Sequence, residues 1–272
     1  MLDAALAMVN RTGLTVSLEH IIFEDVIRDA GVSRSAVYRR WPYKDLFFSD
    51  LLKELARATA PAATANEEAG KELLSAVLAA HRDADLASAK GRHDLVVEMV
   101  RLGAAEDFEA VYDSTEWRTY LALHATFLSL PSGELREEIQ AALARSERGF
   151  IDRIARAWEG LTVVLGYRLR PEAGGSFETI ATLVSANLRG MVTMALSNPE
   201  LVTRRVRVNP VGASAAADWS LQGMAAASIA MTFLEPDPDV EWDEQRLGSL
   251  RALLGAERDR STMVDQSADQ PR

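Results

Sequence analysis

The fold of this chain is decided by the stretch Gly31-Val-Ser-Arg-Ser-Ala-Val-Tyr-Arg-Arg-Trp-Pro-Tyr-Lys-Asp-Leu46. Gly31 follows an apolar-periodic segment and can adopt a positive φ angle without steric cost. Ser33 can cap the helix that follows through its hydroxyl, and Pro42 should end that helix near Trp41. The sequence therefore predicts a short helix of about two turns, bracketed at both ends.

The predicted helix region is basic, although the whole chain has a net charge of −10. Between Ser33 and Lys44 it carries four cations and no carboxylate, the cations being Arg34, Arg39, Arg40 and Lys44. Two interpretations are open, a solvated helix face with ordinary surface arginines or a surface that contacts nucleic acid. A short basic stretch alone favours the first, but the turn and cap that bracket this helix favour the second.

Length and composition limit the class of protein. With 272 residues and 48% hydrophobic content, the chain is long enough for two domains. The absence of cysteine excludes disulfides and thiolate metal sites, and the four histidines have no ligand-like spacing, so we expect neither a metal nor another cofactor. The longest uncharged run, Trp219–Leu234, is too short and polar to span a membrane. The N-terminus lacks a basic leader, so a cytoplasmic protein is expected.

Apolar periodicity predicts four helices in the first 57 residues. The first contains Leu2 and Val9, and the second is expected to begin early, at Ser17, with its apolar stripe including Ile21 and Ile22. The third is the basic helix. The fourth begins after Pro42 and should bury the apolar residues Leu46, Phe47, Leu51, Leu52 and Leu55. Residues 1–57 hold eight cations and eight carboxylates, so this part is neutral and the rest carries the net charge. Pro61 is expected to end the fourth helix and to mark a domain boundary.

The first three helices and the start of the fourth resemble the DNA-binding domain of the TetR family of transcriptional repressors. The resemblance is carried by Ala30-Gly31-Val32-Ser33, Tyr38, Trp41, Pro42 and Lys44 followed by Asp45-Leu46. It implies an all-α fold with a helix-turn-helix domain at residues 1–57 and a helical effector-binding and dimerisation domain at residues 58–256. The polar tail at residues 257–272 is expected to be disordered.

The resemblance implies that Ser33–Trp41 enters the major groove of a palindromic operator, with Tyr38 and Lys44 on phosphates. The residues expected to contact DNA are Ser33, Arg34, Ser35, Tyr38, Arg39, Arg40 and Lys44. The sequence departs from the family pattern in three ways. It begins almost at the first helix, so no basic arm is expected there; Arg40 stands where the family commonly has an aromatic or histidine; and Ile21 and Ile22 stand where Ser or Thr is usual.

The rest of the chain is expected to be helical throughout, with no strand alternation. The predicted helices include Tyr112–Leu130, a long one over Glu134–Val164, and one from Phe177 to Asn198-Pro199. Leu201–Ala217, which contains Arg204, Arg205 and Arg207, is expected to be an exposed loop, with a second nucleic-acid patch as the alternative. A helix rich in Ala, Gly and Ser should follow and pack closely against a neighbour, with a stripe of Ser220, Met224, Ala227, Met231 and Leu234. A last short helix is expected at Trp242–Leu254.

No enzyme motif is present, because the chain has no glycine-rich phosphate loop, no Gly-x-Ser-x-Gly elbow and no His-Glu-x-x-His. A non-enzymatic effector pocket is expected instead, for a small apolar or amphipathic molecule. Its candidate lining consists of Met99, Tyr112, Trp117, Tyr120, His124, Phe127, Trp158 and Met191. Plain core packing is the alternative for every one of these residues.

Dimerisation is expected because one two-turn helix contacts few base pairs, whereas two related by a two-fold axis contact both halves of a palindrome. We place the homodimer interface on Phe177–Leu196 and Asp218–Leu234, with core packing as the alternative. The competing class of function is a helical interaction module of the same fold that has lost specific DNA binding. A third class, an enzyme that uses the aromatic cavity, has less support.

Overall fold

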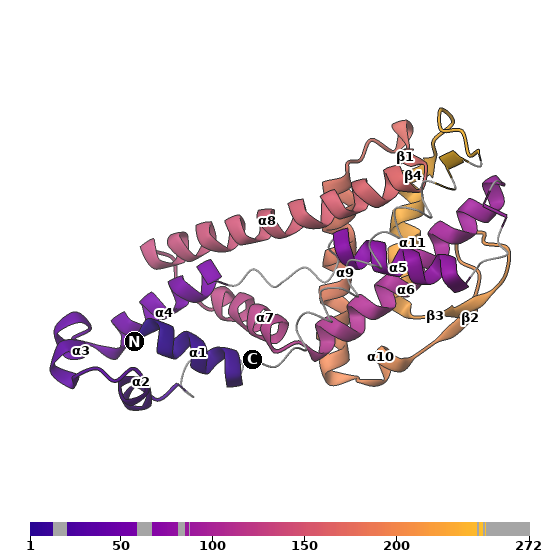
Figure 1. Cartoon of the computed structure of the whole chain (residues 1–272). Coiled ribbons are helices and arrows are strands. Elements are labelled where there is room, and N and C mark those ends of the chain that lie inside the picture. The colour runs from indigo at the N-terminus through magenta and orange to yellow at the C-terminus, as the bar shows by residue number, and fades with distance from the viewer. Residues whose placement is uncertain are drawn as a thin grey trace, which may run out of the picture. The chain divides into compact units, whose positions relative to one another are not determined.

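The computed structural model describes residues 1–12, 21–58, 67–80, 85–86, 88–243, 245–246 and 248. The chain is mainly helical, as expected (Figure 1). Its contacts divide it into unit 1, which is Met1–Ala63 with Ala110–Asp152, and unit 2, which is Thr64–Glu109 with Arg153–Arg272. The unit that holds the first four helices thus also holds a later segment, whereas the sequence suggested a domain of residues 1–57 alone.

Among the described residues, unit 1 contains five whole helices, the beginning of α8 (Glu134–Val164) and the last four residues of α6 (Ala89–Asp113). The whole helices are α1 (Leu2–Thr12), α2 (Phe23–Asp29), α3 (Arg34–Arg40), α4 (Lys44–Ala58) and α7 (Thr115–Leu128). Helix α1 contacts α2, α4 and α7, and α4 also contacts α7. The buried faces of these helices form one apolar core, which includes Val9, Leu51 and Leu123.

A cluster of aromatic rings joins the three helices around the basic stretch. Phe47, at the start of α4, is fully buried and makes edge-to-face contacts with Phe23 of α2 at 5.0 Å and with Trp41 at 5.2 Å between ring centroids. Phe48 completes the cluster at 5.6 Å from Phe47. Such ring pairs contribute an orientation-dependent attraction in addition to apolar burial, because the edge of one ring faces the π cloud of the next. The orientation of α3 is therefore fixed from the side of α2 and α4.

Two predictions about unit 1 are wrong in detail. Helix α2 begins at Phe23 rather than at Ser17, because exposure alternates at Ile21 (2%), Ile22 (53%) and Phe23 (1%), as in an extended segment. Leu46, expected on the inner face of α4, is 49% exposed because the first turn of α4 buries Phe47 instead. Ser17 itself and the predicted end of the fourth helix at Pro61 lie outside the described residues.

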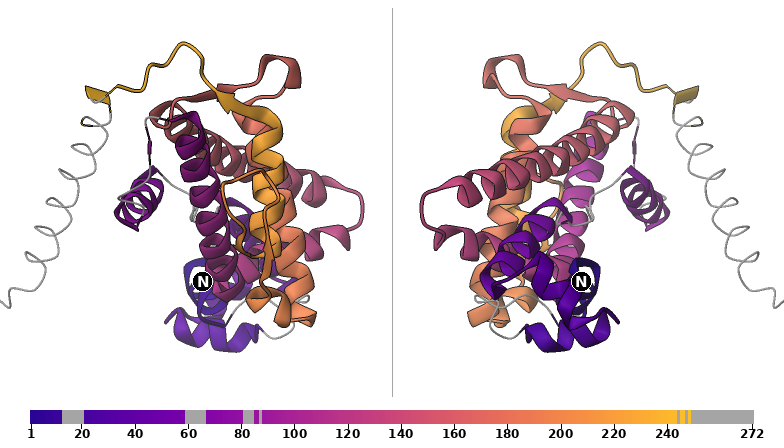
Figure 2. Two further views of the ribbon diagram at one scale, coloured as in Figure 1. Left: turned by 90° about the vertical axis from the view of Figure 1, so that its right-hand side faces the viewer. Right: turned by 90° about the vertical axis from the view of Figure 1, so that its left-hand side faces the viewer.

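Unit 2 is built around two helices that lie side by side, α9 (Phe177–Ser197) and α11 (Leu221–Phe233) (Figure 2). Ser176 and Thr179 form a capping box at the start of α9. Its other helices are α5 (Glu67–Ala80), most of α6 (Ala89–Asp113), the end of α8 and α10 (Glu200–Thr203). The close packing expected for the small-residue helix is present, since α11 buries Gly223, Ala226, Ala227 and Ala230. Of the expected stripe, Met224 and Met231 are only partly buried.

The helix predicted over Tyr112–Leu130 is interrupted. Helix α6 ends at Asp113 and α7 begins at Thr115, because the Ser114 side chain accepts a hydrogen bond from the Trp117 amide at 3.2 Å and caps α7. Helix α8 has the predicted bounds of Glu134–Val164, and α9 ends as predicted before Asn198. The described part of the predicted helix at Trp242–Leu254 is too short to judge, and the tail lies outside the described residues.

The expectation of no strands is also wrong. Strand β1 (Tyr167–Leu169) pairs antiparallel with β4 (Leu234–Pro236). Within the predicted exposed loop, β2 (Val206–Val208) pairs antiparallel with β3 (Ala217–Trp219). The loop between them is held by Asn209, whose amide donates to the Ala213 carbonyl at 2.5 Å while its oxygen accepts from the Ala213 amide at 2.8 Å. The long-range pairing of β1 with β4 is not encoded in local periodicity.

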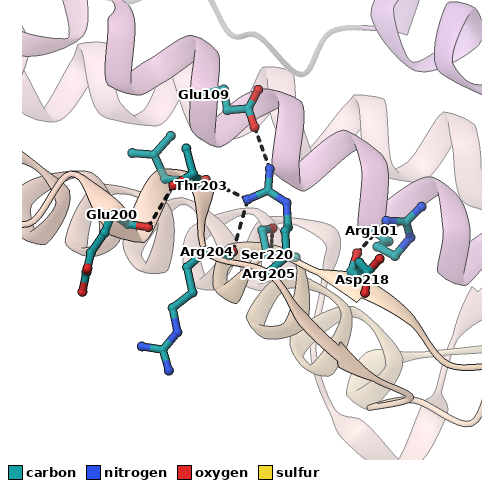
Figure 3. A network of polar contacts seen from close by, with 10 residues as sticks. Arg101, Glu109, Glu200, Thr203, Arg204, Arg205, Asp218 and Ser220 are labelled. Carbon is teal, nitrogen blue, oxygen red and sulfur yellow. Dashed lines mark hydrogen bonds and ion pairs between the residues drawn. The ribbon is translucent and has the colours of Figure 1, made fainter.

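The three arginines of this segment have different environments. Arg205 donates to Glu109 at 2.7 Å, and Arg207 lies 3.6 Å from Asp218 across the hairpin. Arg204 is exposed and its side chain points away from this polar network (Figure 3). Of the three arginines, Arg204 thus agrees best with the expectation of a solvated loop. The ion pair of Arg205 with Glu109 holds the segment against α6.

Helix α9 is the one described helix that is long and apolar enough to cross a membrane, by length and composition alone. A third of its most apolar window is buried, and it packs against α11. Across that contact the Asn187 amide donates a hydrogen bond to the side chain of the buried Gln222. These are properties that the core helix of a globular unit also has.

Replacement of Phe47 by Ala should lower the free energy of unfolding by about 3–5 kcal/mol, because it leaves a cavity among three aromatic rings. Leu46→Ala is the matched control, and its exposed side chain should change stability by no more than about 0.5 kcal/mol. Urea unfolding followed by circular dichroism measures both. Equal effects of the two substitutions would contradict the assignment of the core.

Candidate nucleic-acid interface

The short basic helix predicted from the sequence is present as α3, with the expected boundaries. Gly31 has a φ angle of +64°, in the left-handed region that favours glycine. The Ser33 hydroxyl accepts a hydrogen bond from the Ala36 amide at 3.3 Å and caps the helix. The helix ends at Arg40, and the Trp41 amide donates to the Val37 carbonyl at 2.8 Å. The predicted turn, cap and end are thus confirmed.

Two side chains fix α3 to the core of unit 1. Val37 and Trp41, four residues apart, are buried, and every other residue from Ser33 to Arg40 is exposed. The Trp41 indole nitrogen donates a hydrogen bond to the Asp50 carboxylate at 2.9 Å. This bond satisfies a polar group that would be costly to bury without a partner. Helix α3 is therefore held along one edge and open to solvent elsewhere.

All seven residues predicted to contact DNA are exposed, on α3 or on the adjoining start of α4: Ser33, Arg34, Ser35, Tyr38, Arg39, Arg40 and Lys44. Tyr38 lies with its ring edge-on to Phe23, at 5.9 Å between centroids. Its position is therefore set by the same aromatic cluster that holds α3. The exposed side chains supply four cations and several hydroxyl donors, which suit phosphate oxygens and the acceptor edges of guanine.

Two of the cations already have a partner within the protein. Lys44 lies 3.4 Å from the Glu24 carboxylate, and the Arg40 guanidinium lies over the Trp41 ring at 4.9 Å. The pKa of Glu24 is lowered, first by a hydrogen bond from its own backbone amide and then by Lys44, so this carboxylate stays charged well below neutral pH. A phosphate contact by Lys44 would have to compete with Glu24.

Five of the residues predicted to line an effector pocket lie in unit 1. Trp117 and Tyr120 are buried and lie edge-to-face at 5.4 Å, and Phe150 packs on Trp117 at the same distance. The His124 ring is tilted against the Tyr120 ring, at 4.3 Å between centroids, and the Tyr120 hydroxyl donates to Glu147. Phe127 is partly buried beneath the Arg136 guanidinium. Tyr112 is also partly buried. These contacts are those of a packed aromatic core.

The other three predicted pocket residues lie in unit 2. Met99 is buried in its core, Trp158 packs against that core, and Met191 is partly buried on α9. The described part of the chain contains a cleft of about 410 Å³ beside α3 and one of about 510 Å³ beside α6, and neither is lined by any of the eight residues. The effector pocket at those eight residues stays a prediction.

The cleft beside α6 was not anticipated from the sequence. Its second wall is the loop of the β2–β3 hairpin, a segment that local periodicity did not identify as paired strands. The alternation Val206-Arg207-Val208 before Asn209-Pro210 was the available signal for a hairpin.

Comparison of the chain with protein-family models, curated proteins and solved structures gives no match.

Gly31→Ala should lower the free energy of unfolding by about 1–2 kcal/mol, because a Cβ atom is strained at this φ angle. Space is not the cause, since an added Cβ meets nothing within 4 Å. Gly160, inside α8, also has open space around an added Cβ but has an ordinary helical backbone. Gly160→Ala should therefore raise the free energy of unfolding by about 0.5–1 kcal/mol. Opposite signs in thermal or urea unfolding are expected, and equal signs would contradict the role of Gly31 as a left-handed turn.

Proposed function

We propose that this protein is a DNA-binding transcriptional regulator, in which α2, the turn at Gly31 and α3 act as a helix-turn-helix. The observation that carries the proposal is the exposure of α3, which buries Val37 and Trp41 and leaves its arginines open to solvent. A helix held along one edge can enter a major groove about 12 Å wide without unfolding its support. The resemblance of residues 30–46 to the TetR family supports the same function.

The exposed residues of α3 divide by chemistry into two roles. Arg34, Arg39 and Arg40 are suited to base edges, because a guanidinium can donate two parallel hydrogen bonds to guanine O6 and N7. Tyr38 and Lys44 are suited to phosphates, together with the hydroxyls of Ser33 and Ser35. Phosphate contacts orient the helix and base contacts select the sequence.

We propose that the protein acts as a homodimer through α9 and α11. Support comes from one face of α9, where Leu183 and Met194 are exposed although large and apolar. Ala186 and Gly190 lie between them and are also exposed, so another helix could approach closely. A two-fold dimer would present two α3 helices to the two halves of a palindromic operator.

Repression released by a small apolar or amphipathic effector is the proposed regulation, in a cytoplasmic protein. The effector would bind more tightly to a form in which the two α3 helices do not match successive major grooves, and DNA would then dissociate. The affinity ratio between the two forms sets how far any ligand can shift the equilibrium.

A second candidate is a helical interaction module that does not bind DNA specifically. It is favoured by the contacts of Lys44 with Glu24 and of Arg40 with Trp41, which compensate two of the four cations near α3. The two candidates differ in salt dependence, because binding to phosphates weakens steeply as salt rises whereas an apolar protein contact does not.

Substitutions on α3 should separate base contacts from phosphate contacts. With a duplex selected from a random-sequence pool, Arg34→Ala or Arg39→Ala should cost about 1–3 kcal/mol of binding and relax the preference at one base pair. Lys44→Ala should weaken binding to all duplexes and reduce the salt slope by about 1. Tyr38→Phe should likewise weaken binding to all duplexes.

Arg57→Ala is the matched control, since this exposed arginine ends α4 and pairs with Glu54. It should leave the affinity and the salt slope nearly unchanged. Fluorescence anisotropy at several salt concentrations measures all of these variants. If no substitution on α3 alters DNA binding more than Arg57→Ala does, the proposal fails.

The dimer is tested by placing charges on the exposed side of α9. Leu183→Glu combined with Met194→Glu should convert the dimer to a monomer in analytical ultracentrifugation, because the carboxylates would be buried unpaired at the interface. Leu128→Glu alters a more exposed apolar residue at the end of α7 and should not affect the sedimentation of the dimer. A dimer that survives the double substitution would place the interface elsewhere.

A further inference from the structure

The cleft beside α6 has one wall of charged side chains and one wall of small ones. Its volume of about 510 Å³ lies within the range of pockets that hold drug-sized molecules. The α6 side contributes Lys90, Asp94, Glu98 and Arg101, and the hairpin side contributes the loop Ala213–Ala217. We name this space the α6 cleft.

The loop wall is ordered by specific hydrogen bonds. Asp94 accepts from the Ser214 amide at 2.7 Å with one carboxylate oxygen and from the Ser214 hydroxyl with the other. Asn209 closes the loop on Ala213 from the other end. Because four of the five residues from Ala213 to Ala217 are alanine, the wall is apolar and leaves space that longer side chains would fill.

The charges of the cleft are unequally compensated. Arg101 donates two hydrogen bonds to Glu98, at 2.6 and 2.7 Å. It donates a third to the Asp218 carbonyl at 2.8 Å (Figure 3). The pKa of Arg101 is raised, first by its hydrogen bond to Glu98, so these two side chains neutralise each other. Asp94, one turn before Glu98, is held only by the neutral donors of Ser214.

No lysine or arginine of the described chain forms an ion pair with Asp94, which is partly buried. The other charges of the lining are Asp85 and Lys90, both exposed, where water and salt screen them. A partly buried carboxylate without a cation, next to an apolar wall, is the environment in which a ligand cation gains most from charge-assisted hydrogen bonding.

We propose that the α6 cleft binds a small organic cation, in which an ammonium group donates to Asp94 and an apolar body lies against the alanine loop. Leu95 and Trp219 close the floor of the cleft with buried apolar side chains. Arg101 does not favour an anion in the same place, because Glu98 neutralises its charge and three of its five donors are already used by Glu98 and the Asp218 carbonyl. Binding of the cation to the cleft does not require that the protein bind DNA. Only a role of the cation as an effector rests on the proposed function.

Three probes with the same naphthalene body but different charge test the chemical class: 1-naphthylmethylammonium, 1-naphthylmethanol and 1-naphthoate. Isothermal titration calorimetry with the full chain should give at least about tenfold tighter binding for the cation than for the alcohol, which corresponds to about 1.4 kcal/mol. The carboxylate should bind more weakly than either. Tightest binding by naphthoate, or no binding by any probe, would overturn the proposal.

Asp94→Asn removes the charge but keeps an oxygen that can accept from Ser214, so it should reduce the affinity for the cation about tenfold with little change in fold. Glu200→Gln removes an exposed carboxylate from α10 and is the matched control, with the affinity expected to stay within about twofold. Ser214→Ala removes the hydroxyl donor and frees one carboxylate oxygen of Asp94, so this variant should bind the cation at least as tightly. Unchanged binding to Asp94→Asn would overturn the proposal.

The same preparations distinguish this inference from the proposed function. DNA affinity is measured by anisotropy without any probe, so failure of cation binding with intact DNA binding removes only the ligand site. If the cation binds as expected and also releases DNA from the wild type but not from Asp94→Asn, the cleft is an effector site as well. Cation binding without any effect on DNA supports the site and excludes its regulatory role.

Discussion

The contact of Phe47 with Phe23 and Trp41 is the interaction on which the N-terminal part of this protein depends. These rings come from α4, from α2 and from the end of α3, and Phe47 is fully buried between them. Helix α3 has only seven residues, far fewer than a helix needs to persist alone in water. Its stability must therefore come from Val37 and Trp41 packed against its neighbours. The remaining residues of α3 are free to face a partner.

Different residues of α3 pack against the core and face solvent, and this separation connects the core to the proposed function. The Trp41–Asp50 hydrogen bond fixes the end of α3, and the Ser33 cap fixes its beginning. Because neither contact uses an arginine of α3, Arg34 and Arg39 can bind an external group without loosening the helix. Lys44 differs, since binding a phosphate would exchange one ionic partner, Glu24, for another. Its contribution to affinity should be smaller than that of an unpaired cation.

The features predicted correctly from the sequence are those with local causes. The turn at Gly31, the cap at Ser33 and the stop at Pro42 depend on backbone sterics within a few residues. The long helix α8 was also predicted, because its apolar residues recur at helical spacing over many turns. The sequence pattern did not predict that Phe23 rather than Ile22 lies in the core, since either residue fits a helical apolar stripe.

What local pattern could not supply was contact between distant segments. Asp94 and Ser214 are 120 residues apart, and β1 pairs with β4 across a segment that contains α9, α10, the β2–β3 hairpin and α11. The α6 cleft exists only because the hairpin loop docks on α6, so no window of sequence contains it. The predicted pocket residues were chosen by aromatic character, and of those in unit 1 Trp117 and Tyr120 are buried, with Trp117 packed on Phe150.

The most direct test of the central claim is hydrogen–deuterium exchange of the full chain with and without a selected duplex. Backbone amides of residues 31–46 should exchange more slowly when DNA is bound, because α3 would be buried in the major groove and its local opening suppressed. Protection should decrease as salt is raised, in parallel with affinity. Protection confined to the Arg204–Arg207 segment, or none within residues 31–46, would contradict the account.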